Sequence, residues 1–284
     1  MPLNDAQSDA LLAAIREVAA KEIRPHFRDL AQDAIDAKST FDDLVTVADR
    51  AAETALTQRV ADLLPGASVV GEEAVSANGR VLDRVADGRC VVIDPIDGTW
   101  NFAHGLANYG VIVAVIEDGV TVWGCLYDPN FDDWVLGVKD GGCHFHSGDR
   151  RHPLKVSQDD IPFERLRGNI GEYLYPAADR PGLSALVPRF RRYTNLGASV
   201  HEYRMLCQGG TDFVLNGGLN VWDHAAGVLC FQEAGGVSRL LDGFCYEPVL
   251  TKGRLLSART EKLWRALADA FNDALSGPLG EPVV

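Results

Sequence analysis

The sequence predicts an α/β protein made of two closely packed subdomains. The chain has 284 residues, of which 46% are apolar and 24% charged, so it can bury a substantial core. Stretches with helical periodicity alternate with short apolar runs that have the length of strands. The polar segment 148–160, which contains a proline, is the best candidate for a boundary. We therefore predict an N-terminal subdomain, 1–150, and a C-terminal subdomain, 151–284.

Two helices and two strands are predicted in the first hundred residues. Pro25 is expected to kink or shorten the end of the first helix. The second helix begins among the acids Asp42, Asp43 and Asp49, and Pro65 stops it. The apolar runs that follow are typical of buried strands. The predicted helices lie within 5–30 and 37–66, and the predicted strands are 67–71 and 90–93.

The remaining elements follow the same two patterns. Two hairpins are expected, because apolar runs are joined by Asp-Gly turns at 117–119 and 140–142. Beyond the boundary, strands and helices alternate and end with an amphipathic helix. The predicted hairpins lie within 110–129 and 131–148, the later helices within 197–210, 221–236 and 259–275, and the later strands within 211–217 and 237–241.

The chain is acidic, with 40 acids, 27 bases and a formal net charge of −13. This balance argues against a nucleic-acid partner, because contacts with phosphates need a basic patch. No apolar run approaches the roughly 20 residues of a membrane span, and the N-terminus lacks the pattern of a secretory signal. We expect a cytoplasmic protein with no membrane partner, whose six cysteines are reduced and buried.

The strongest chemical signal is DPIDGT at residues 94–99. A predicted buried strand ends at Asp94, and Asp97 follows three residues later. Carboxylates this close repel each other and raise each other's proton affinity unless a cation neutralises them. Mg²⁺ prefers oxygen ligands, and carboxylates at this spacing can bridge two ions. The motif therefore predicts a metal site; the alternative is an acidic surface turn at Asp97-Gly98.

Residues on either side of this motif can complete the site. Gly98 and Thr99 can open a short helix, whose free N–H groups and dipole hold a phosphate oxygen. Glu72 and Glu73 follow a short apolar run, where the alternative is a solvated, acidic helix start. Asp223 precedes a predicted helix and is a good N-cap, a role it can combine with metal binding.

Several segments stand in a distinctive order along the chain. They are Lys38, DLVTVAD at 43–49, GEE at 71–73, DPIDGTWNF at 94–102, WDHAAG at 222–227 and EAGG at 233–236. In this order and at these separations they resemble the inositol monophosphatase family, which belongs to a superfamily of lithium-sensitive, metal-dependent phosphatases. The resemblance covers nearly the whole chain. It implies a layered α/β/α/β/α sandwich with the site between two subdomains.

The resemblance further implies two to three Mg²⁺ ions in one site. The first ion would be bound by Glu72, Asp94 and the backbone carbonyl of Ile96. The second would be bound by Asp94, Asp97 and Asp223, so that Asp94 bridges the two ions. A third, weaker ion would use Glu72 mainly through water, and Li⁺ is expected to inhibit.

The chemistry implied by the family is an in-line attack of water on phosphorus. Thr99 and Asp49 would orient and deprotonate that water, while Gly98 and Thr99 would bind the phosphate. The metals would lower the pKa of water and stabilise the attacking and leaving oxygens. The implied catalytic residues are Thr99, Asp49 and Glu72, with Glu73 and Lys38 supporting the metal ligands from behind.

Two departures from the family pattern lie where the alcohol of the substrate is bound. Asn216 stands where inositol monophosphatases often have a glutamate, so it offers hydrogen bonds without charge. Ala198 replaces a threonine. The sequence WNF at 100–102 is closer to the inositol branch than to the nucleotide-bisphosphate or histidinol-phosphate branches. The implied substrate-binding residues are Asp97, Ala198, Asn216 and Asp223.

These observations favour a Mg²⁺-dependent phosphatase for a small phosphate monoester, with inositol 1-phosphate as the leading substrate. The same chemistry on histidinol phosphate, fructose 1,6-bisphosphate or a nucleotide 3′(2′),5′-bisphosphate is the first alternative. The second is a non-catalytic protein that binds a metal or a partner, against which the complete ligand set argues. Because family members are commonly homodimers, a homodimer is expected.

Overall fold

The structure is a computed structural model that describes residues 3–31, 34–38 and 44–275. Its helices are interspersed with strands, as the sequence predicted. The α-helices are α1 (Asp5–Val18), α2 (Val47–Leu63), α3 (Glu72–Ala77), α4 (Thr99–Ala103), α5 (Arg180–Leu186), α6 (Ser199–Cys207), α7 (Val221–Glu233) and α8 (Glu261–Ala274). Short 3-10 turns are η4 (Gly79–Val85), η5 (Phe163–Arg165), η6 (Glu172–Leu174) and η7 (Val187–Arg189).

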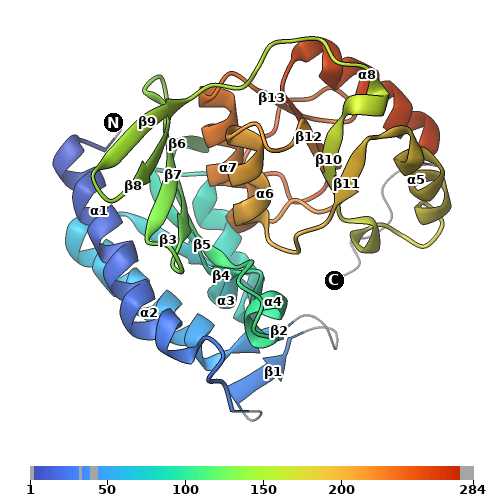
Figure 1. Ribbon diagram of the computed structural model, residues 1–284. Helices are drawn as coiled ribbons and strands as arrows, with labels where there is room; N and C mark the ends of the chain where they lie inside the picture. The colour runs from blue at the N-terminus through green and yellow to red at the C-terminus, as the bar shows by residue number, and fades with distance from the viewer. Residues whose placement is uncertain (1–2, 32–33, 39–43, 276–284) are drawn as a thin grey trace.

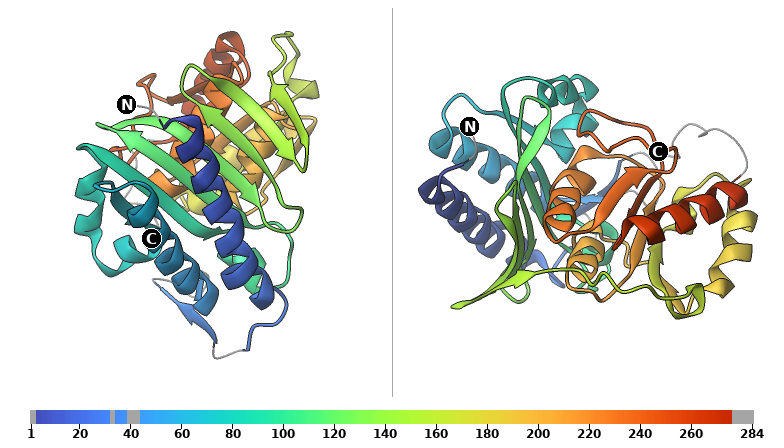
Figure 2. Two further views of the ribbon diagram at one scale, coloured as in Figure 1. Left: turned by 90° about the vertical axis from the view of Figure 1, so that its left-hand side faces the viewer. Right: turned by 90° about the horizontal axis from the view of Figure 1, so that it is seen from above.

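The elements stack in five layers. Helices α1 and α2 cover one face of a seven-stranded sheet, and α6 and α7 lie between this sheet and a five-stranded one (Figure 1). Helices α5 and α8 cover the outer face of the second sheet, as the view from above shows (Figure 2). Three apolar cores lie between the layers: one under α1 and α2, one around α6 and α7 that reaches both sheets, and one under α5 and α8. The layer order α/β/α/β/α confirms the predicted fold.

The seven-stranded sheet carries the two predicted hairpins. Its strands, in spatial order, are β3 (Ser68–Gly71), β4 (Arg89–Asp97), β5 (Gly110–Glu117), β6 (Val120–Asp128), β7 (Asp133–Val138), β8 (Gly142–Ser147) and β9 (Arg150–Leu154). Strands β3 and β4 are parallel, and from β4 onward each strand pairs antiparallel with the next. Asp118 and Asp140 turn the hairpins with φ of 48° and 59°, a region that aspartate tolerates better than most residues.

The five-stranded sheet has the order β11-β10-β12-β14-β13. Its strands are β10 (Arg167–Ile170), β11 (Arg192–Thr194), β12 (Phe213–Asn216), β13 (Val237–Leu240) and β14 (Leu255–Ala258), and a small separate sheet pairs β1 (Ile35–Ala37) with β2 (Leu44–Thr46). Strands β12 and β13 were predicted, whereas β10, β11 and β14 were not. Strand β9 extends the first sheet into the predicted boundary segment, and the division at residue 150 stays a prediction.

Helix α1 is shorter than the predicted helix 5–30. After Val18 the backbone widens into a π-helical turn, η1 (Ala19–Ile23), and then tightens into a 3-10 turn, η2 (Arg24–His26). Pro25 has no N–H to donate and crowds the residue before it, which accounts for the end of the helical turns at His26. The expected shortening by Pro25 is therefore confirmed.

Helix α2 begins later than predicted. Thr46 and Asp49 form a capping box: the side chain of Thr46 accepts from the backbone N–H of Asp49, and the side chain of Asp49 accepts from the backbone N–H of Thr46. This pair of bonds fixes the start of the helix at Val47. Of the acids predicted at the helix start, Asp49 lies in the first turn, but the helix does not reach back before Val47, because residues 44–46 pair as a strand. Asp42 and Asp43 lie outside the described residues.

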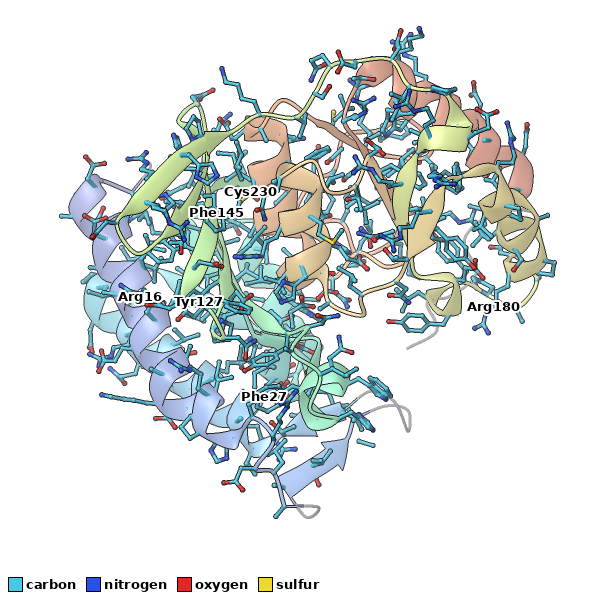
Figure 3. All side chains as sticks on the ribbon, viewed as in Figure 1. Arg16, Phe27, Tyr127, Phe145, Arg180 and Cys230 are labelled. Atoms are coloured by element: carbon cyan, nitrogen blue, oxygen red, sulfur yellow. The ribbon has the colours of Figure 1, made fainter. Side chains whose placement is uncertain are left out.

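An ion pair and a hydrogen bond to Asp132 attach α1 to the seven-stranded sheet. Arg16 of α1 donates from Nε to Asp132 Oδ1 at 2.7 Å, and Tyr127 of β6 donates to the same oxygen at 3.0 Å. Arg16 and Tyr127 lie beside each other where α1 crosses the sheet (Figure 3). Asp132 thus links the first helix to the strands that it covers.

Two glycines let α7 lie close to the seven-stranded sheet. A Cβ on Gly124 of β6 would lie 2.7 Å from the Cα of Ala226, and one on Gly137 of β7 would lie 2.7 Å from the Cα of Cys230. Figure 3 labels Cys230 where α7 faces the sheet. Because Asp223 is in the first turn of α7, this close approach also places that carboxylate.

Two expectations from composition can be compared with the structure. All six cysteines are free; five are buried as expected, whereas Cys245 is exposed in the segment after β13. Among residues 3–31, 34–38 and 44–275, no helix combines the length and apolar character needed to cross a membrane.

Gly124→Ala is expected to lower the free energy of unfolding by roughly 1–3 kcal/mol, because the new methyl group must displace the backbone of α7. Urea denaturation measures the change. Gly79→Ala is the matched control, since a Cβ at Gly79 meets no atom within 4 Å. Equal stability of the two variants would show that α7 does not depend on this close approach.

Candidate active site

Three aspartates from distant segments meet where β4 ends and α7 begins. Asp94 and Asp97 lie at the end of β4, and Asp223 lies in the first turn of α7. One carboxylate oxygen from each residue lies within 4.8 Å of those from the other two. Asp94 and Asp97 are buried, and Asp223 is partly exposed. The structure thus brings three of the predicted metal ligands together.

An irregularity in β4 makes this convergence possible. Side chains alternate between the faces of a regular strand, so residues three apart, such as Asp94 and Asp97, would point to opposite faces. The register with β5 is regular up to the pair Asp94–Ile112 and shifts before the pair Asp97–Gly110. Pro95, which cannot donate a ladder hydrogen bond, lies within this shift. The bulge therefore re-aims one of the two carboxylates.

The cluster is electrostatically strained in the absence of a cation. Burial raises the pKa of Asp94 well above its usual range, and the charges of Glu72, Asp97 and Asp223 raise it further. Burial also raises the pKa of Asp97 to about 7. Oδ1 of Asp94 is buried and has no hydrogen-bond partner. An unpartnered acceptor among crowded carboxylates fits a hard divalent cation, which prefers oxygen ligands.

Glu72 opens α3 beside the cluster and is paired with a lysine. It lies outside the group of atoms within 4.8 Å, yet its charge contributes to the raised pKa of Asp94. Nζ of Lys38 lies 2.8 Å from Glu72 and 2.6 Å from Glu73. Burial lowers the pKa of Lys38, but the two carboxylates outweigh this effect, so its pKa is raised. The lysine therefore stays charged and holds both glutamates.

Asp49 and Thr99 form a hydrogen-bonded pair next to the cluster. Oγ1 of Thr99 lies 3.1 Å from Oδ1 of Asp49 and 2.9 Å from the carbonyl oxygen of Ile96. Oδ2 of Asp49 accepts from the backbone N–H of Thr46 at 2.8 Å. Burial raises the pKa of Asp49 to about 7, although the hydrogen bonds from Thr46 oppose the shift. A carboxylate with such a pKa can accept a proton near neutral pH.

Gly98 turns the chain from β4 into α4. Its φ of 83° lies in the left-handed region, and a Cβ would lie 2.8 Å from the carbonyl oxygen of Asn108 and 2.9 Å from the Cβ of Ala198. Both conformation and space therefore require glycine here. The short helix that the sequence predicted begins at Thr99, with Gly98 as its N-cap.

The residues predicted to contact the alcohol come from three places: Asp97 from β4, Ala198 and Asp223 from the starts of α6 and α7, and Asn216 from the five-stranded sheet. Ala198 precedes α6, and the backbone N–H of Val200 donates to Oδ2 of Asp97 at 2.5 Å, so this end of α6 contacts the cluster. Asn216 ends β12 and is buried, and its Nδ2 has no hydrogen-bond partner. The loop after Asn216 leads to α7 and to Asp223.

Two residues that the sequence analysis did not identify contact this region. Nδ2 of Asn220 donates to Oδ2 of Asp223 at 3.1 Å, and its place three residues before an aspartate at a helix start could have indicated this bond. Glu202 of α6 accepts from the backbone N–H of Leu196 at 3.1 Å, and burial raises its pKa to about 7. No local sequence signal marks Glu202, because a single glutamate in a helix is usually solvated.

Comparison with known families decides the affiliation of this chain. The model of the inositol monophosphatase family matches residues 5–276. The chain belongs to the inositol monophosphatase family. A protein of Thermotoga maritima, named fructose-1,6-bisphosphatase/inositol-1-monophosphatase, is 30% identical over 72% of this chain and 74% of its own. The inositol-1-monophosphatase SuhB of Mycobacterium tuberculosis is 32% identical over 71% of this chain and 70% of its own.

Solved structures show the same fold. An inositol monophosphatase from Zymomonas mobilis has a TM-score of 0.77 and 26% identity, covering 95% of this chain and 100% of its own. An IMPase from Thermotoga maritima has a TM-score of 0.79 and 24% identity, covering 95% and 98%. As a member of this family, the present chain is a phosphomonoesterase. The family is metal-dependent, and the cluster of Asp94, Asp97 and Asp223 offers the acidic ligands.

In metal-free protein, Asp94→Asn is expected to raise the free energy of unfolding by roughly 1–2 kcal/mol. The substitution removes one charge from a crowded, poorly solvated set, and one unit of pKa shift corresponds to about 1.4 kcal/mol. Denaturation in the presence of a chelator measures the change. Asp273→Asn, at an exposed position of α8, is the control. A less stable Asp94→Asn protein would mean that the carboxylates do not repel each other.

Proposed function

We propose that this chain is a Mg²⁺-dependent phosphatase that hydrolyses a small phosphate monoester, with inositol 1-phosphate as its leading substrate. The unpartnered carboxylate oxygen of Asp94 carries the proposal, because it lies among crowded acids whose charge a bound cation would offset. The Asp49–Thr99 pair beside it offers a proton acceptor. Family membership supports the phosphate ester as substrate.

The proposed metal ligands form two sets that share Asp94. Glu72, Asp94 and the backbone carbonyl of Ile96 would hold one Mg²⁺, and Asp94, Asp97 and Asp223 would hold a second. Glu72 would hold a third, weaker ion mainly through water. Bound Mg²⁺ supplies Lewis acidity: it lowers the pKa of water and stabilises charge on the attacking and leaving oxygens. Li⁺ is expected to inhibit.

The side chains of the protein would orient the water and move its proton. Thr99 Oγ1 would orient the attacking water, and Asp49, whose pKa burial raises to about 7, would accept the proton through this hydroxyl. The backbone N–H groups of Gly98 and Thr99, where α4 begins without a side-chain cap, would bind phosphate oxygens. Lys38 and Glu73 would keep Glu72 in place.

The choice among alcohols would fall to Asn216 and the residues around it. Asn216 has a buried, unpartnered amide that can donate to a substrate hydroxyl. Ala198, Asp97 and Asp223 would complete the wall around the alcohol. The names of the mycobacterial and Thermotoga relatives favour inositol 1-phosphate, and the second of them keeps fructose 1,6-bisphosphate as the next candidate.

A panel of phosphate esters tests the substrate. With Mg²⁺ present, phosphate release is expected to show the highest kcat/KM for inositol 1-phosphate, because its hydroxyls match an uncharged amide donor at Asn216. The panel also holds fructose 1,6-bisphosphate, histidinol phosphate and a nucleotide 3′(2′),5′-bisphosphate. If inositol 1-phosphate is the poorest substrate, the assignment is wrong. Release from none of them favours the non-catalytic alternative.

Asp94→Asn is expected to reduce kcat at least about 100-fold while the protein stays folded, because the shared ligand charge contributes several kcal/mol to the transition state. Circular dichroism checks the fold, and Asp273→Asn is again the control. More than about a tenth of the wild-type rate in the Asp94→Asn protein would contradict its bridging role.

Asn216→Ala is expected to change the ratio of kcat/KM between inositol 1-phosphate and fructose 1,6-bisphosphate by at least about tenfold, with a smaller effect on kcat, because the amide would contact the alcohol and not the phosphate. Steady-state kinetics on both substrates measures the ratio. Equal losses on both would refute a role for Asn216 in selectivity.

The proposal also includes the assembly and location that the family resemblance implies. We expect a homodimer in the cytoplasm, with no nucleic-acid or membrane partner. Sedimentation velocity reports the dimer directly, and a purely monomeric protein at micromolar concentration would exclude it.

A further inference from the structure

Glu53 connects two helices that contribute to the metal site. It lies on α2, four residues after Asp49, and its carboxylate reaches the start of α3. Oε2 accepts from the backbone N–H of Glu73 at 2.8 Å, and Oε1 accepts from that of Ala74 at 2.9 Å. Glu73 and Ala74 are the second and third residues of α3, and a helix-capping side chain normally accepts its hydrogen bond from an N–H at one of these positions. Glu53 therefore caps α3 from a neighbouring helix.

Gly71 makes room for this cap. It precedes α3, where a capping side chain would normally stand, and its φ of −103° and ψ of 153° suit any residue. A Cβ at this position would lie 2.2 Å from Cδ of Glu53 and 2.4 Å and 2.5 Å from its two oxygens. Space for the carboxylate of Glu53, and not the backbone conformation, therefore requires glycine at this point.

Burial of Glu53 is unfavourable on electrostatic grounds. The residue is 7% exposed, burial raises its pKa, and the charges of Glu73 and Glu72 raise it further. The hydrogen bonds from the backbone N–H groups of Glu73 and Ala74 oppose this shift. Burying a further carboxylate beside an acidic site costs free energy, which the two hydrogen bonds to the start of α3 offset. We therefore expect the role of Glu53 to lie in the geometry that these bonds determine.

The geometry in question is the start of α3. This helix spans only Glu72–Ala77, and a helix of this length does not form without outside contacts. Its first residue is Glu72, which Lys38 holds by the side chain and Glu53 holds through the neighbouring backbone. Displacing the cap would move the backbone from which Glu72 projects.

We propose that Glu53 is a positioning residue that places Glu72 in the metal site and so sets the affinity for Mg²⁺. The inference rests on the proposed function, since it takes Glu72 as a metal ligand. Glu53 touches neither the three-aspartate cluster nor the Asp49–Thr99 pair in the contacts described above. It acts through the start of α3 alone.

Calorimetric titration with Mg²⁺ tests the proposal. Glu53→Gln has one acceptor oxygen for two N–H groups, and it is expected to raise the Kd for Mg²⁺ roughly tenfold, the lower end of what loss of a ligand's supporting partner costs. Asp62→Asn, an exposed carboxylate on the same helix, is the matched control and is expected to bind as wild type does. The titration is made far below the unfolding temperature, where a general loss of stability does not change Kd.

A double substitution tests the steric part without any metal. Gly71→Ala is expected to lower the unfolding temperature of metal-free protein by roughly 3 °C or more, and to have almost no effect when Glu53→Ala is already present. Independent, additive effects would overturn the steric coupling. If Glu53→Ala does not fold, Gly71→Ala alone still has to raise the Kd for Mg²⁺.

The outcomes separate this inference from the proposed function. If the wild-type protein does not bind Mg²⁺, the proposed function fails before any variant is compared. If the wild type binds Mg²⁺ and Glu53→Gln binds it equally well, the positioning role is wrong and the proposed function stands.

Discussion

Mutual repulsion among the carboxylates of Asp94, Asp97 and Asp223 constrains how the surrounding elements are placed. Their oxygens approach within 4.8 Å where two of the three side chains are buried. Burial is the largest cause of the raised pKa of each, and the charges of neighbouring acids raise it further. Such a cluster persists in a folded protein only if positive charge, hydrogen-bond donors or a bound cation offsets it. The bulge in β4 and the close approach of α7 to the sheet bring the three groups together.

Helix starts offset much of the repulsion among these carboxylates. Helices α2, α3, α4, α6 and α7 begin near the site, and the first turn of a helix carries partial positive charge and unpaired N–H groups. Asp49 caps its own helix, Asp97 accepts from Val200 at the start of α6, and Glu53 caps α3. The same acids therefore also hold the starts of α2, α3 and α6 beside the site.

The sequence predicted the fold well where patterns were long or turn signals were strong. Both hairpins, the terminal helix and the short helix after Gly98 were found, whereas the start of α2 was missed because an acidic stretch resembles a helix start. Single motifs could not have shown that Asp94 and Asp223 meet, since a bulge and two glycines on separate strands produce that contact. Glu53 and Glu202 carried no local signal, because their roles depend on backbone groups far away in the chain.

The central claim is that the cluster at the end of β4 exists to bind divalent cations. Anomalous diffraction from crystals soaked in Mn²⁺, which accepts the same oxygen ligands as Mg²⁺, tests it most directly. The account predicts strong anomalous peaks in contact with Asp94, at least one of them shared with Asp97 and Asp223. Crystals that show no peak at this position, or peaks only at other acids on the surface, would contradict it.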